Sequence, residues 1–150
     1  MDATVIQPQF WQRWRNSHRL ALLAAFEDST TGTRVREFCQ GLSRSLGSHC
    51  RLVEHVWLFR TLRLGELREI AAEEACASDL IIISTHQAEG LSAEVKGWIE
   101  LWLRPEVRHP AVLLALLDPE YNEGPSAVQT YLQEVARRGG MQFIAGPPER

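Results

Sequence analysis

The stretch Asp79-Leu80-Ile81-Ile82-Ile83-Ser84-Thr85 decides the fold class. Its four central residues are all large and apolar, and no polar residue alternates with them. A strand that is covered on both faces has this pattern, as do the parallel strands of α/β proteins. The stretch therefore predicts a central strand of a parallel sheet, in which we expect Ile82 to be fully buried.

Four further apolar runs lie on either side of this stretch. They are Leu20–Phe26, Cys50–Phe59, Ala111–Leu117 and Met141–Ala145. The centres of successive runs lie about 28 to 32 residues apart, which is roughly the length of a strand-plus-helix unit. The five runs thus predict five strands, and Leu22 and Leu114 are expected to be as buried as Ile82.

The segments between the runs carry apolar residues at helical spacing. The expected buried stripes are Val35, Phe38, Cys39, Leu42 and Leu46, then Leu67, Ile70, Ala71 and Ala75, then Val95, Trp98, Ile99, Trp102 and Leu103, and finally Val128, Leu132, Val135 and Ala136. Five strands joined by four right-handed crossovers predict a three-layer αβα, doubly wound parallel sheet in the order 2-1-3-4-5. We expect residues 18–150 to form this single domain, and residues 1–17 to be an N-terminal extension with a short helix.

Composition narrows the classes of function. The chain has 150 residues, 45% of them hydrophobic and 23% charged, which is typical of one soluble globular domain. A net charge of −3 provides no basic field for binding nucleic acid or an anionic membrane. The longest runs that contain no polar residue, Leu20–Phe26 and Ala111–Leu117, have seven residues each, whereas a membrane-spanning helix needs about 20. Three scattered cysteines without a CxxC pair are typical of a reducing compartment, so we expect a cytoplasmic protein.

A ligand crevice is expected where the strand order reverses, beyond the carboxyl ends of the strands. In the predicted sheet this point lies between strands 1 and 3. The segments that would line the crevice follow strands 1, 3 and 4, and they are Glu27–Thr33, Ser84–Gly90 and Asp118–Asn122. Candidate binding residues are therefore sought in these three segments.

The first segment contains Ser29-Thr30-Thr31-Gly32-Thr33-Arg34 at the start of a helix. It resembles the flavin-phosphate loop of the flavodoxin family, which has the form Ser/Thr-x-Thr-Gly-x-Thr after strand 1. The resemblance implies that Ser29 to Thr33 wrap the phosphate of FMN and that the bound flavin transfers electrons. We therefore expect FMN, or another anionic ligand, to bind in the crevice of strands 1, 3 and 4. Thr85, His86 and Tyr121 would then flank the flavin, with Tyr121 as the stacking residue. The chain also resembles a group of uncharacterised bacterial α/β proteins that carry Glu-Asp-x-x-Thr-Gly-x-Arg here, matching Glu27 to Arg34.

Other features of the same segments favour a protein without flavin. Arg34 replaces the final hydroxyl of the flavodoxin pattern, and Glu27 and Asp28 would repel a phosphate. No aromatic residue follows strand 3. The alternative is a cofactor-free protein-interaction module, in which Asp28 or Ser29 caps the helix and occupies the N–H groups of residues 30–33. In the flavin hypothesis, Asp28→Asn would remove a repulsive charge and strengthen binding.

Two other kinds of site use residue types that are found in these segments. A phosphoreceiver site needs an aspartate after strand 3 and a lysine after strand 5, where this chain has Ser84-Thr85-His86 and Gly146-Pro147-Pro148. That class is excluded. Carboxylates and an imidazole that converge on the crevice could bind a metal or act as acid and base, but their spacing matches no metal-site pattern. These residues are Glu27, Asp28, His86, Glu89, Asp118 and Glu120.

The chain's tryptophan and arginine residues suggest a surface for contact with another protein, because both residue types are often central to protein–protein interfaces. The expected third helix carries Trp98, Leu101 and Trp102, which make its apolar surface wider than one core face needs. Together with Trp11 and Trp14 they predict a homodimer with tryptophan-rich contacts. The alternative is that both helical tryptophans lie under the chain's own N-terminal segment.

Overall fold

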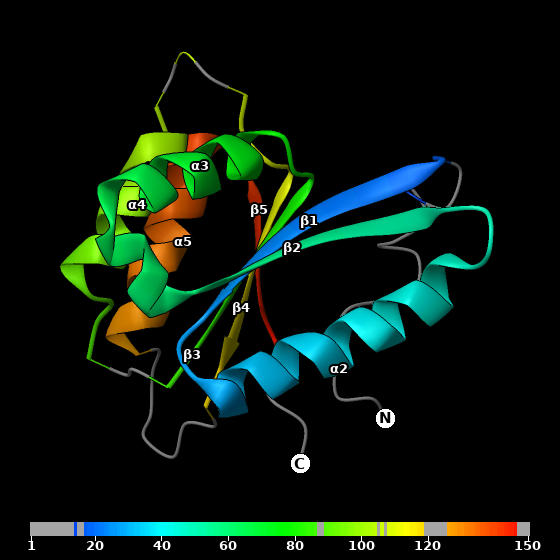
Figure 1. Ribbon diagram of the computed structural model, residues 1–150, viewed down its shortest axis with the longest axis horizontal. Coiled ribbons are helices and arrows are strands. Elements are labelled where there is room, and N and C mark those ends of the chain that lie inside the picture. Colours follow the sequence, from blue (N-terminus) through cyan, green and yellow to red (C-terminus); the bar gives the residue numbers. More distant parts are fainter. Residues whose placement is uncertain are drawn as a thin grey trace.

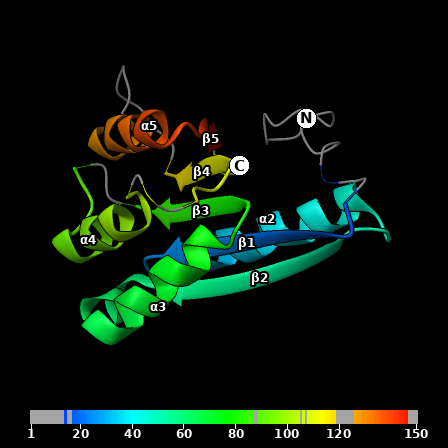
Figure 2. The same ribbon diagram turned by 90° about the horizontal axis from the view of Figure 1, so that it is seen from above.

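The computed structural model describes residue 14 and residues 17–86, 89–104, 106, 108–118 and 126–146. Five parallel strands form one sheet in the order β2-β1-β3-β4-β5, which confirms the predicted doubly wound topology. Figure 2 shows this order from β2 at the bottom to β5 at the top. The strands are β1 (Arg19–Phe26), β2 (Arg51–Leu58), β3 (Leu80–Thr85), β4 (Val112–Leu117) and β5 (Gln142–Gly146).

Helices cover both faces of the sheet. One face carries α2 (Ser29–Leu46), and the other carries α3 (Gly65–Cys76), α4 (Ala93–Trp102) and α5 (Ala127–Gly139), as Figure 1 shows. A short 3-10 helix, η2 (Phe59–Arg63), joins β2 to α3. The fold is therefore the flavodoxin-like three-layer arrangement that the spacing of the apolar runs predicts.

The central strands carry the core. Every residue of β3 and β4 is buried, and the exposed fractions of Leu22, Ile82 and Leu114 are 0%, 0% and 1%, as predicted. Alternate residues contribute to two separate clusters, so that Ile82 packs on the α2 side and Ile83 on the side of α3, α4 and α5. The continuous apolar sequence of β3 is thus explained by helices on both of its faces.

Helical stripes match their predictions in α4 and α5, and nearly so in α2, where Phe38 is only partly buried. In α3 the prediction is partly wrong. Ile70 is 46% exposed, while the neighbouring Ala72 is buried together with Ala71 and Ala75. Small alanines let α3 lie close to the sheet, so the inward face of this helix is set by size rather than by hydrophobicity.

The tryptophans of α4 do not form a contact surface. Trp98 and Trp102 are both 0% exposed, and their rings meet edge to face at 5.9 Å inside the cluster beneath α3, α4 and α5. Trp14, a residue of the N-terminal segment that the structure describes, belongs to the other cluster, on the α2 side. Trp11 and the expected N-terminal helix lie outside the described residues. The homodimer stays a prediction, without the support of these two tryptophans.

Within the described residues, no helix is long and apolar enough to cross a membrane.

Candidate functional site

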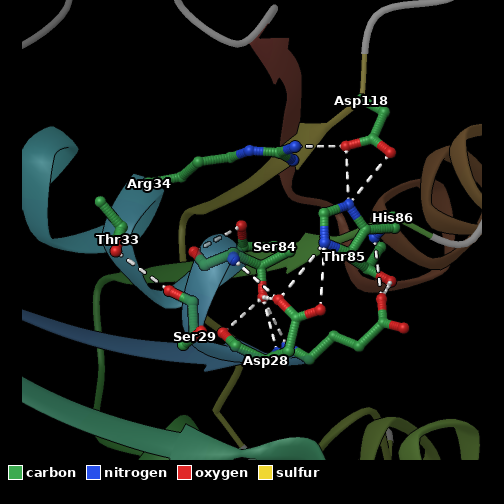
Figure 3. Close-up of polar contacts among 10 residues, drawn as sticks. Asp28, Ser29, Thr33, Arg34, Ser84, Thr85, His86 and Asp118 are labelled. Carbon is green, nitrogen blue, oxygen red and sulfur yellow. Dashed lines mark hydrogen bonds and ion pairs between the residues drawn. The ribbon is translucent and has the colours of Figure 1, made fainter.

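Polar side chains meet at the carboxyl ends of β1, β3 and β4. Strands β1 and β3 are neighbours in the sheet although β2 lies between them in the chain, so the strand order reverses here. Figure 3 shows Asp28, Arg34, His86 and Asp118 directed toward one another at this edge. This is the edge at which the rule for open α/β sheets predicts a ligand crevice.

The connection from β1 to α2 has only two residues, Glu27 and Asp28. Asp28 caps α2, with its Oδ1 accepting from the backbone N–H of Thr31 at 3.0 Å. In return, the Oγ1 of Thr31 accepts from the backbone N–H groups of Glu27 and Asp28, both at 2.9 Å. Thr31 is fully buried, so its hydroxyl fills the inside of the turn. This reciprocal arrangement is a capping box.

The residues expected to wrap a phosphate form the first turn of a helix. Residues 29–33 all lie in α2, and Asp28, rather than Ser29, provides the cap that the sequence predicted for the free protein. The N–H of Gly32 already donates to the backbone oxygen of Asp28 at 2.8 Å. A Cβ on Gly32 would lie 3.0 Å from the ring of Phe26, so glycine here permits close packing of α2 on β1.

Glu27 connects this turn to the end of β3. Its Oε1 accepts from the hydroxyl of Thr85 at 2.7 Å and from the backbone N–H of His86 at 2.9 Å. A further bond joins the same segments, because the hydroxyl of Ser84 donates to the backbone oxygen of Thr31 at 3.0 Å. The predicted site residue Thr85 is therefore a buried support of the turn, with no exposed surface.

His86 lies between two carboxylates. Its Nδ1 is 2.9 Å and 3.0 Å from the two carboxylate oxygens of Asp118, and its Nε2 is 3.1 Å from Oδ2 of Asp28. The hydrogen bond with Asp118 raises the pKa of His86, and the negative charges of Asp118 and Asp28 add to this effect against partial burial. Two acceptors on opposite ring nitrogens fit an imidazolium, which donates from both.

Arg34 closes the network from the first turns of α2. Its Nη2 forms an ion pair with Oδ1 of Asp118. Burial acts to raise the pKa of Asp118, but hydrogen bonds from Arg34 and His86 outweigh it, and this pKa lies below its ordinary value. The pKa of Asp28 is also lowered, chiefly by the backbone hydrogen bond from Thr31. Arg34 is where the sequence departs from the flavodoxin pattern.

Of the six acidic and imidazole residues expected at the crevice, four meet. Glu27, Asp28, His86 and Asp118 are linked by the contacts described above. Glu89 is exposed, and the remaining residue, Glu120, lies outside the described residues, as does the candidate stacking residue Tyr121. The described part of the chain contains no group of three or more His, Cys, Asp or Glu side chains that could hold a metal ion.

The pairing of Arg34 with Asp118 was not foreseen from the sequence. The two residues are 84 positions apart, and only the sheet topology brings the first turns of α2 next to the end of β4. The signal that could have indicated the pair is the cation at the last position of the loop pattern, opposite a carboxylate that follows a central strand.

A comparison with models of known protein families and with curated proteins finds no match for this chain. The site is therefore interpreted from its own geometry.

Proposed function

We propose that this protein is a flavodoxin-like domain that works without flavin, as a cofactor-free protein-interaction module. The observation that carries the proposal is the capping box at the β1–α2 turn. Among the backbone N–H groups of residues 30–33, which a phosphate at this turn would need, that of Thr31 already donates to the side chain of Asp28 and that of Gly32 to the backbone oxygen of Asp28. A flavin phosphate would have to break these bonds before it could bind.

Charge supports the same conclusion. The carboxylate of Asp28 lies at the turn and that of Glu27 lies at the end of the neighbouring β3, so a phosphate at the turn would meet the negative charge of Asp28 directly. Each pair of like unit charges at about 4 Å costs between about 1 kcal/mol in water and about 4 kcal/mol at a protein surface. In the free protein Arg34 and His86 are paired with Asp118, so a phosphate at the β1–α2 turn gains no attraction from them unless Asp118 is displaced.

The surface between α3 and α4 supports an interaction role. A groove of about 460 Å³ lies there, lined by Glu69, Ala72, Glu73, Cys76, Leu101 and Arg104. On the same helix, Ile70 exposes 46% of its surface to solvent. The groove itself combines the apolar side chains of Ala72 and Leu101 with charged side chains at its rim, a composition that favours contact with another protein.

A second copy of the chain is the partner that fits this groove. One wall carries the carboxylates of Glu69 and Glu73 and the other carries the exposed guanidinium of Arg104. In a two-fold pairing the same patch is used by both copies, so the Arg104 of each copy can face the acidic wall of the other. The apolar floor at Ala72 and Leu101 would be buried in the contact.

We place the protein in the cytoplasm. All three cysteines, Cys39, Cys50 and Cys76, are free thiols, and burial raises the pKa of Cys39 to about 12. Buried, unpaired thiols are typical of proteins in a reducing compartment.

The experiment is an absorption spectrum of the protein, expressed in a cell that makes flavins and purified without added cofactor. A colourless preparation is expected, because the donors of the turn are occupied. A yellow preparation with the visible bands of a bound flavin would overturn the proposal.

A further inference from the structure

We propose that Arg34 and His86 form a binding site for an oxyanion group, and that the carboxylate of Asp118 occupies this site in the free protein. The ligand would carry a carboxylate or a phosphate, which replaces Asp118 on the two cationic side chains. This inference goes beyond the proposed function and does not depend on it, because it concerns Arg34 and His86 rather than the donors of the β1–α2 turn.

The geometry of Asp118 is that of a bound anion. Both of its carboxylate oxygens are within 3.0 Å of Nδ1 of His86, and one of them also pairs with Nη2 of Arg34. Its side chain is 37% exposed, whereas that of Arg34 is 19% exposed and that of His86 is 32% exposed. The carboxylate is thus the most exposed of the three groups, and Figure 3 shows it directed at the guanidinium of Arg34 and the ring of His86.

Asp118 leaves part of the site unused. Nη1 of Arg34 is buried and has no hydrogen-bond partner within the described residues. A guanidinium presents its donors as a rigid fork that matches two oxygens of a carboxylate or phosphate. Asp118 pairs with only one nitrogen of this guanidinium, Nη2. An anion that is not tethered to the chain can turn so that it also accepts a hydrogen bond from Nη1. A buried donor without a partner is costly, and this cost is removed when such an anion binds.

Carboxylates around His86 limit how strongly a second anion can bind at this site. Asp28 contacts Nε2 on the other side of the imidazole, and the carboxylate of Glu27 accepts from the backbone N–H of His86. The charge of Asp28 helps to keep His86 cationic, and both carboxylates repel a second negative charge. Asp118 is tethered, so it competes with any free anion at a high effective concentration. We therefore expect free acetate or phosphate to bind the parent protein weakly, and a ligand with additional contacts to bind it well.

The test removes the internal occupant. In Asp118→Ala, Arg34 and the protonated His86 lose their counter-ion and the site opens. Inorganic phosphate and acetate are titrated separately at about pH 5.5, with ionic strength held constant by chloride, because the variant lacks Asp118, the main cause of the raised pKa of His86, and its imidazole must still be protonated. Binding is followed through the NMR shifts of the His86 ring. We expect Asp118→Ala to bind at least one anion about tenfold more tightly than the parent protein does.

A control variant separates a specific site from general attraction. In the double variant Arg34→Ala/Asp118→Ala, the guanidinium is absent, and the gain in affinity should be lost. The better of the two anions indicates whether the natural group is a carboxylate or a phosphate. If Asp118→Ala does not fold, Asp118→Asn is titrated instead, because it removes the charge at nearly constant shape and should also bind more tightly than the parent. No gain in affinity, or an equal gain in the double variant, overturns the proposal.

Discussion

Replacing Thr31 by valine tests the capping box most sharply. Valine keeps the β-branched shape of threonine in a fully buried position, so the change removes only the hydroxyl. That oxygen accepts from the N–H groups of Glu27 and Asp28, both at 2.9 Å. The N–H of Glu27 keeps a second acceptor, the backbone oxygen of Ser84 at 3.2 Å, whereas the N–H of Asp28 has no other acceptor among the bonds of this turn. One backbone donor is therefore orphaned.

An orphaned donor in a partly buried turn costs about 1–3 kcal/mol, and this is the loss of unfolding free energy expected for Thr31→Val. Thr33→Val is the matched control, because the same substitution is made in the same helical turn. The hydroxyl of Thr33 is exposed and donates to the backbone oxygen of Ser29 at 3.0 Å, so water can replace it. The control should lose less than about 0.5 kcal/mol.

Urea denaturation of the parent protein and both variants provides the measurement, with the slope of each transition compared to confirm that the unfolding reaction is unchanged. Equal losses in the two variants, or a loss below about 0.5 kcal/mol in Thr31→Val, would refute the role assigned to the buried hydroxyl.

Two further predictions concern His86 and the α3–α4 groove. Because the folded-state pKa of His86 is raised, its contribution to stability should be fully present below about pH 6.5 and lost as the pH rises through the folded-state pKa. Urea midpoints measured across this pH range should fall with rising pH in the parent protein and in the variant of an exposed histidine, His49→Gln, but not in His86→Gln. A fall of equal size in His86→Gln would contradict the stabilising role assigned to His86. For the groove, light scattering should report a particle of twice 17.0 kDa for the parent protein. Arg104→Glu should be monomeric. The double variant Glu73→Arg/Arg104→Glu, in which the two charges are exchanged, should form the dimer again. A parent particle of 17.0 kDa at high micromolar concentration would end the dimer proposal.

The fold could be predicted because the central strands β1, β3 and β4 are short and apolar, and because one α-helix separates each strand from the next. The unbroken run around Ile82 can only be covered on both faces, and this requirement leads to a doubly wound sheet. The burial of α3 was harder to predict, because Ala71, Ala72 and Ala75 give a weak hydrophobic signal and Ile70 gives a misleading one.

The candidate site could be predicted only in part. Placement at strand ends identified Glu27, Asp28, His86 and Asp118, since the carboxyl ends of parallel strands meet at one edge. The role of Thr31 was ambiguous, because a hydroxyl three residues after an aspartate suits both a phosphate loop and a capping box. Only the structure distinguishes the two, since it places Thr31 inside the turn rather than on its surface.

A measurement of flavin binding tests most directly the central claim, that the backbone N–H donors at the crevice are already occupied by the protein's own acceptors. FMN is titrated with the parent protein and with Asp28→Asn, and quenching of flavin fluorescence is followed. Asparagine removes the charge that repels a phosphate but can still cap α2, so the backbone donors stay occupied. We predict no quenching by either protein at concentrations on the order of tens of micromolar. Saturable quenching by the parent protein, strengthened in Asp28→Asn, would contradict the account and identify the crevice as a flavin site.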